Sequence, residues 1–107
     1  MANYVTLIRF TEQGAKAIAQ TCQRAASFAA RAEKMGVRVQ ASYWTLGNVD
    51  GVLVFEAPDD ETATSAMLGL SALGNVHTQT LRAFDASEMT AILAKLSAPA
   101  GRGRKRG

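Results

Sequence analysis

The spacing at which hydrophobic residues recur changes several times along the chain, and each change marks the end of a predicted element. Residues 4–10 and 51–56 are short runs of β-branched and aromatic residues, which is typical of strands. Residues 76–84 indicate a fourth, weaker strand. Residues 37–44 alternate and predict a strand that pairs with 51–56 as a hairpin. Its expected faces are Val37, Val39, Ala41 and Tyr43 on one side, and Arg38, Gln40, Ser42 and Trp44 on the other.

Residues 12–35 predict a helix, because apolar residues recur there at spacings of three and four. Thr11 is a suitable N-cap and Gly36 a suitable C-terminal residue. An unbroken helix would be roughly 36 Å long against strands of roughly 23 Å, so we expect a break near Thr21. The core-facing stripe is expected to be Ile18, Cys22, Ala25, Phe28, Ala29, Ala32 and Met35. Arg24 falls on the polar side.

Two further helices follow. Asp59 has the form of an N-cap with acidic residues after it, and Gly74 and Asn75 end the apolar repeat of that helix. Asp85 and Glu88 have capping-box spacing and begin a short third helix. Its apolar residues are Met89, Ile92, Leu93 and Leu96.

The order of elements predicts an α+β fold, a ferredoxin-like βαββαβ sandwich with an extra C-terminal helix. Right-handed crossovers place both long helices on one face of a four-stranded antiparallel sheet. The other face, apolar in 4–10 and 51–56, would present roughly 400 Å², a size that usually marks a binding surface. We expect two copies of the chain to pack these faces together. The alternative is that the last helix folds back over the face within one chain.

Composition narrows the class of protein. The chain has 107 residues, 48% of them hydrophobic, which fits one globular domain over residues 1–98. One Cys and one His exclude an internal disulfide and a structural zinc site, so no metal is expected. No apolar run is long enough to span a membrane, and the amino end lacks the pattern of a secretory leader, so we expect a cytoplasmic protein.

The net charge of +3 comes from the last residues. Residues 1–100 hold eight basic and nine acidic side chains, whereas the end of the chain carries Arg102, Arg104, Lys105 and Arg106. We interpret residues 99–107 as a disordered basic Gly/Arg tail. Nucleic acid is therefore an expected partner only through nonspecific contact with this tail, because the body has no basic patch with interleaved aromatics.

Five segments resemble the GYD domain family of the dimeric α+β barrel superfamily. They are Tyr-Trp-Thr-Leu-Gly at 43–47, Asp50, residues 56–61, Leu-Gly-Asn-Val at 73–76, and Thr-Leu-Arg-Ala-Phe at 80–84. The resemblance implies a ferredoxin-like fold and oligomers built through the sheet. The superfamily includes cofactor-independent monooxygenases and isomerases, which is an analogy at the level of fold. No cofactor is expected.

Four residues are candidates for a site. Trp44 could stack on a ligand or form the rim of a subunit interface. Arg82 could hold an acidic substrate in the same cavity, or pair with an acid such as Glu56. Asp50 in the hairpin could bind a ligand or act as a base, but it also suits a turn, and His77 could be a general acid or base or a solvated strand residue. Cys22, on the apolar stripe, is expected to be a buried thiol.

Two classes of function remain open. The first is small-molecule binding, including a cofactor-independent enzyme of the dimeric α+β barrel type, with the site between the sheet and the second long helix or between protomers. The second is a non-catalytic structural or regulatory self-assembly module. No phosphate-binding glycine loop, catalytic triad spacing or metal motif decides between them.

Overall fold

The architecture comes from a computed structural model that describes residues 1–97. The predicted tail at 99–107, with its four basic residues, lies outside the described residues. The elements in chain order are β1 (Ala2–Phe10), α1 (Glu12–Lys16), the 3-10 helix η1 (Ile18–Gln20), α2 (Thr21–Lys34), β2 (Arg38–Trp44), β3 (Gly51–Ala57), α3 (Asp60–Ala72), β4 (Val76–Ala83) and α4 (Ala86–Leu96).

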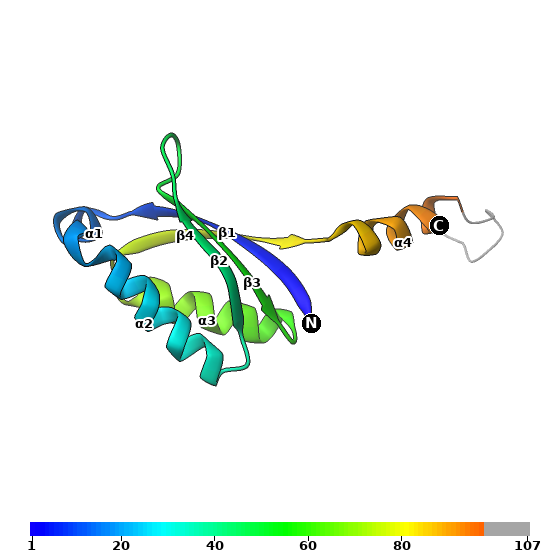
Figure 1. Cartoon of the computed structure of the whole chain (residues 1–107), viewed down its shortest axis with the longest axis horizontal. Helices are drawn as coiled ribbons and strands as arrows, with labels where there is room; N and C mark the ends of the chain where they lie inside the picture. The colour runs from blue at the N-terminus through cyan, green and yellow to red at the C-terminus, as the bar shows by residue number, and fades with distance from the viewer. Residues whose placement is uncertain (98–107) are drawn as a thin grey trace.

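The four strands form one antiparallel sheet in the order β2-β3-β1-β4. Helices α2 and α3 both lie on one face of this sheet, and within residues 1–97 no helix covers the other face (Figure 1). This is the predicted ferredoxin-like α+β fold with an additional C-terminal helix. In this order β2 and β4 occupy the two opposite edges, so their side chains are separated by the width of the sheet.

Side-chain caps begin the helices where the sequence predicts them. Thr11 Oγ1 accepts a hydrogen bond of 3.0 Å from the Gly14 N–H, and Asp59 Oδ1 accepts one of 2.7 Å from the Thr62 N–H. Asp85 and Glu88 form a reciprocal capping box at α4, which satisfies two backbone donors at once. The predicted starts of three helical segments are therefore confirmed.

The predicted break in the first helical segment is also confirmed. α1 ends at Lys16, and the three residues of η1 separate it from α2, which begins at Thr21. A 3-10 turn holds about three residues rather than 3.6, so it changes the direction in which later side chains point. The stripe is buried only in its second half, at Phe28 and Ala32, whereas Ile18, Cys22 and Met35 are exposed.

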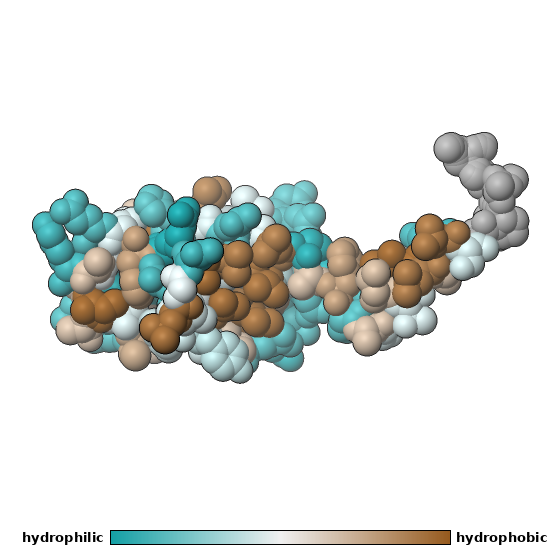
Figure 2. All heavy atoms as spheres, turned by 90° about the horizontal axis from the view of Figure 1, so that it is seen from above, coloured by the Kyte–Doolittle hydropathy of each residue, from teal (hydrophilic) through white to brown (hydrophobic). Residues whose placement is uncertain are grey.

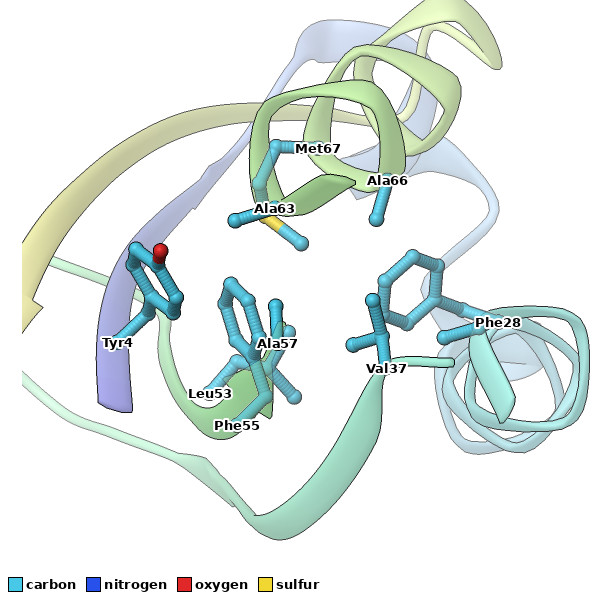
Figure 3. Close-up of a cluster of buried hydrophobic side chains, with 10 residues drawn as sticks. Tyr4, Phe28, Val37, Leu53, Phe55, Ala57, Ala63, Ala66 and Met67 are labelled. Atoms are coloured by element: carbon cyan, nitrogen blue, oxygen red, sulfur yellow. The ribbon is translucent and has the colours of Figure 1, made fainter. Parts of the chain in front are cut away.

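The core lies between the helices and the face of the sheet that they cover (Figure 3). The rings of Tyr4 and Phe55 stack with centroids 5.2 Å apart, and Met67 of α3 lies above them. Thr6 is fully buried among these apolar groups. Its hydroxyl is satisfied by Thr80 Oγ1 at 2.8 Å and lies 3.3 Å from Met67 Sδ, so the buried polar group does not destabilise the core.

The alternation predicted for β2 is wrong beyond its first two residues. Val39 pairs with Phe55 and Ala41 pairs with Val54, so Gln40 is an extra residue, a β-bulge. Side chains directly opposite each other share a face of the sheet. After the bulge, Ala41 and Tyr43 therefore point away from the helices, and Ser42 and Trp44 point toward them. Arg38, opposite Glu56, lies on the face away from Trp44.

The sheet face away from the helices is apolar in its middle. We call this surface the open-face patch. Two cross-strand rows form it: Ala41, Val54, Val5 and Leu81 in one, and Tyr43, Val52, Leu7 and Gln79 in the next. Figure 2 looks onto this face and shows brown apolar side chains gathered there with hydrophilic residues around them. Arg38 opposite Glu56, and Arg9 opposite His77, lie at its ends.

Helix α4 does not cover the open-face patch. It continues in the direction of β4 and projects beyond the end of the sheet (Figure 1). None of its residues is buried. The alternative in which the last helix folds back over the sheet is therefore wrong within the described chain, because β4 leads directly away from the body into α4 with only Phe84 and Asp85 between them.

Candidate functional site

A hollow with a mostly apolar lining lies between α2 and the helix-facing side of the sheet. Its volume is about 330 Å³, which is within the size range of small-molecule sites. Aromatic and aliphatic side chains from both layers line it, among them Phe10, Phe28, Leu53, Leu70 and Val76. A few polar groups reach the same space: Thr21, Ser42, Asn75, Trp44, Asp50 and Arg24. We call it the α2 hollow.

Trp44 forms one wall of the α2 hollow. It is the last residue of β2, and the bulge at Gln40 directs it to the helix side. Its indole Nε1 donates a hydrogen bond of 3.0 Å to Thr21 Oγ1 at the start of α2. The side chain thus joins the edge strand to the helix, while 46% of the residue stays accessible to solvent.

Asp50 also lines the α2 hollow, at the end of the hairpin. Its Oδ2 accepts a hydrogen bond of 2.8 Å from the Phe10 N–H, and its own N–H donates one of 2.8 Å to the Ile8 carbonyl. These bonds secure the hairpin to the end of β1, a structural role that differs from the local bond two residues on that Asp favours in turns. The structure brings Asp50 and Trp44 to one hollow, and a catalytic role for Asp50 stays a prediction.

Arg82 is not part of this hollow. It lies in β4, at the opposite edge of the sheet from Trp44, and lines a second hollow of about 390 Å³ beside α3. Its Nη2 lies 3.8 Å from Glu88 Oε2, and its guanidinium lies 4.6 Å from the centre of the Phe84 ring. The prediction that Arg82 shares a cavity with Trp44 is therefore wrong. The expected partner Glu56 is wrong too, because it lies on the other face.

His77 is exposed and does not reach either hollow. It pairs with Arg9 across the sheet, on the face that carries the open-face patch. Nothing in this position brings it to Asp50, the other weak catalytic candidate, which lines the helix-side hollow. The surroundings of His77 fit a solvated strand residue, and its role in proton transfer stays a prediction.

Tyr4 and Asp60 form a contact that the sequence pattern did not indicate. The buried Tyr4 hydroxyl donates a hydrogen bond of 2.5 Å to Asp60 Oδ1 in the first turn of α3. Burial, together with this hydrogen bond and the negative charge of Asp60, raises the pKa of Tyr4 from 10.0 to about 12. The phenol is therefore neutral at physiological pH and serves as a fixed donor. Tyr4 also borders the hollow that contains Arg82.

Cys22 and Arg24 differ from their expected places. Cys22 is exposed and borders the α2 hollow, so the expected buried thiol is wrong. Arg24, expected on the solvent side, lines the hollow instead. Its Nη1 donates a hydrogen bond of 2.7 Å to the Ala17 carbonyl, whereas its Nη2 is buried without a hydrogen-bond partner among the described residues. Both residues lie in α2, where Arg24 precedes the buried Phe28 by four residues and therefore shares its face of the helix.

Two features are absent from residues 1–97, a cluster of metal ligands and a helix suited to span a membrane. Residues 1–97 contain no group of three or more His, Cys, Asp or Glu side chains placed to hold a metal ion. None of the helices in that range is both long and apolar enough to cross a membrane.

The order of the elements and of the strands defines a ferredoxin-like α+β protein. Comparison with known proteins gives its family. The GYD domain family matches residues 4–93, and the chain belongs to this family. One relative is the glutamine synthetase and cystathionine beta-lyase binding protein of Thermus thermophilus. It is 36% identical over 94 residues, which cover 87% of this chain and 99% of that protein. No solved structure matches the chain.

Proposed function

We propose that this protein is a non-catalytic protein-binding module that self-associates through its open-face patch and docks on a metabolic enzyme through α4. The observation that carries the proposal is the apolar middle of the open sheet face, which the described chain leaves uncovered. A patch of this kind on a small protein usually marks an interface.

The open-face patch suits a second copy of the same chain. Its middle is aliphatic, with Val5 and Val54 in adjacent strands, and Leu81 beside them is 44% exposed. Polar and charged residues, including Arg38 and Glu56, lie at its end, as at the rim of an interface. Packing two such faces together would remove the apolar rows of both copies from water, each large side chain contributing roughly 1.5–3 kcal/mol when fully buried.

Helix α4 suits a different partner. Met89, Ile92, Leu93 and Leu96 are all exposed. Their spacing of i, i+3, i+4 and i+7 is the pattern by which a helix binds in an apolar groove. An isolated helix of 11 residues is marginal in water, so packing against a partner would stabilise it. Its capping box holds the first turn in place before binding.

The proposed partners of α4 come from the name of a related protein. The relative from Thermus thermophilus is named for binding glutamine synthetase and cystathionine beta-lyase. Its sequence is 36% identical and aligns with 87% of this chain, so a shared binding role is a reasonable proposal. We propose that these two enzymes, in the organism that encodes this chain, are the partners of α4.

The experiment is biolayer interferometry with the two enzymes immobilised and the full chain in solution. The matched variants are Leu93→Glu on α4 and Leu68→Glu on α3, which are 49% and 65% exposed. We expect the wild type and Leu68→Glu to bind one or both enzymes, and Leu93→Glu to lose at least about tenfold in affinity, because the charge would have to be desolvated in a groove. Equal binding by the two variants, or no binding by the wild type, would contradict docking through α4.

The second candidate function is small-molecule binding, which the α2 hollow favours. This hollow combines an apolar lining with a small number of polar groups, which is the usual composition of a ligand site. Trp44 and Asp50 both belong to it. Binding in the α2 hollow is compatible with protein binding, because α4 and the open-face patch lie elsewhere on the molecule.

A further inference from the structure

We infer that the α2 hollow takes an apolar monocarboxylate, whose body fills the hollow and whose carboxylate is held by Arg24. This inference rests on the second proposed function, small-molecule binding in the α2 hollow. It adds the chemical class of the ligand and names a binding residue that neither the family match nor the named relative assigns.

The Arg24 guanidinium carries a donor that the described protein does not use. Nη1 is engaged by the Ala17 carbonyl at 2.7 Å, which fixes the side chain beside the junction of η1 and α2. Nη2 is shielded from solvent and has no acceptor among residues 1–97. Buried polar groups are almost always hydrogen-bonded, and leaving a charged donor unpaired is costly. Arg24 lines the hollow, so a small turn of its guanidinium would bring this donor to an acceptor on a ligand there.

The lining favours an apolar body on that ligand. Phe28 and Ala25 from α2 face Leu53 and Ile8 from the sheet across the hollow, and Trp44 closes its edge. The volume of about 330 Å³ leaves room for a bicyclic aromatic ring or a medium alkyl chain. Burying such a group contributes roughly 25 cal/mol per Å² of apolar surface.

The charged side chains that line the hollow indicate whether its ligand is an acid or an amine. Arg24 and Asp50 are the two charged side chains that line it among the described residues. Asp50 Oδ2 already accepts a hydrogen bond from the Phe10 N–H at 2.8 Å, so part of its acceptor capacity is used by the protein. Arg24 still has a complete buried N–H₂ group to donate. The group without a partner is therefore a donor, so the ligand has to supply an acceptor. Among acceptors, a carboxylate matches a guanidinium best.

The test is isothermal titration calorimetry of the full chain. Its probes are similar in shape and differ in the charge of their polar group. The probes are 2-naphthoate, its neutral isostere 2-naphthamide, and the cation 2-naphthylmethylammonium, with decanoate as a second acid of different shape. We expect at least one acid to bind, and 2-naphthoate to bind at least about tenfold more tightly than 2-naphthamide if it is the one that fits. A preference for the cation would overturn the inference, because Asp50 would then set the charge of the ligand.

Variants identify the residue responsible. Arg24→Gln removes the charge but keeps an amide donor on a shorter side chain, and Arg31→Gln is the matched control on the exposed side of α2. Arg24→Gln is expected to bind the acid at least about tenfold more weakly while leaving affinity for the amide unchanged. A merely structural Arg24 would lower both affinities together, which would contradict the inference. Equal binding of acid and amide by the wild type would overturn the inference but leave small-molecule binding intact, whereas no binding of any probe would overturn both.

Discussion

Trp44 Nε1 donates a hydrogen bond of 3.0 Å to Thr21 Oγ1, and this bond joins the last residue of the edge strand β2 to the first residue of α2. Both residues line the α2 hollow, so the bond also sets the width of the hollow at this edge. It exists because two local irregularities coincide. The bulge at Gln40 turns Trp44 toward the helices, and the break after η1 places Thr21 at the start of a new helix.

Removing the acceptor for Trp44 tests this connection. Thr21→Val keeps the shape of the side chain but loses the hydroxyl, so we expect the free energy of unfolding to fall by about 0.5–1 kcal/mol. Thr21→Ser keeps the acceptor and is the control. Urea denaturation followed by the fluorescence of Trp44, the single tryptophan of the chain, measures both variants. A loss of the same size in both variants would contradict the importance of the hydrogen bond.

Gly14 tests how α1 packs on the turn between α3 and β4. A Cβ at this position would lie 2.0 Å from the Asn75 carbonyl oxygen, which is a backbone atom. Gly14→Ala is therefore expected to lower the free energy of unfolding by about 1–3 kcal/mol. Gly69→Ala is the matched control, because a Cβ added there would meet nothing within 4 Å beyond its chain neighbours and its own helix backbone, and alanine favours a helix by about 0.5–1 kcal/mol. Thermal unfolding should move in opposite directions for the two variants.

The Tyr4 to Asp60 contact predicts a pH dependence at the alkaline end. The folded pKa of Tyr4 is about 12 against 10.0 for a free tyrosine, so the folded state holds this proton more tightly. The resulting stabilisation is fully present below pH 10.0 and is lost as pH rises toward about 12.

The measurement compares the wild type with Tyr4→Phe, which lacks the phenol. Near neutral pH the variant should be less stable by about 1 kcal/mol, because the hydrogen bond to Asp60 is absent. The difference between the two proteins should shrink above pH 10.0, since only the wild type loses the Tyr4 contribution there. Denaturation curves at several pH values provide the readout, and a difference that stays constant from neutral to alkaline pH would contradict the raised pKa.

Much of the fold could be predicted from the sequence because its determinants are local. Thr11, Asp59 and Asp85 cap helices through side chains that act within three residues of their own position. The break near Thr21 followed from a length mismatch, and the positive φ of Gly36, 87°, marks the end of the helical segment. The GYD segments gave the same fold through family resemblance.

The candidate site was harder to predict because part of its geometry depends on one extra residue in strand β2. An extra residue at Gln40 separates Arg38 from Trp44, and an alternating sequence contains no mark of such a bulge. Arg24 stands four residues before Phe28 in α2, so helical spacing places it on the face that turns toward the hollow, and the interpretation of Arg24 as a polar-side residue did not take this into account. The separation of Arg82 from Trp44 has a different cause. A βαββαβ order places the second and fourth strands at opposite edges, and the interpretation of one shared cavity did not take this into account.

If the open-face patch is an interface between copies of the chain, as we propose, the mass of the protein in solution must exceed that of one copy. Sedimentation equilibrium of the full chain, over a range of concentrations, should give at least twice the 11.3 kDa of one copy. Leu81→Glu places a charge in the patch and should shift the mass toward 11.3 kDa, whereas Leu68→Glu on α3 should leave the oligomer intact. A wild-type mass of 11.3 kDa at every concentration would contradict the account.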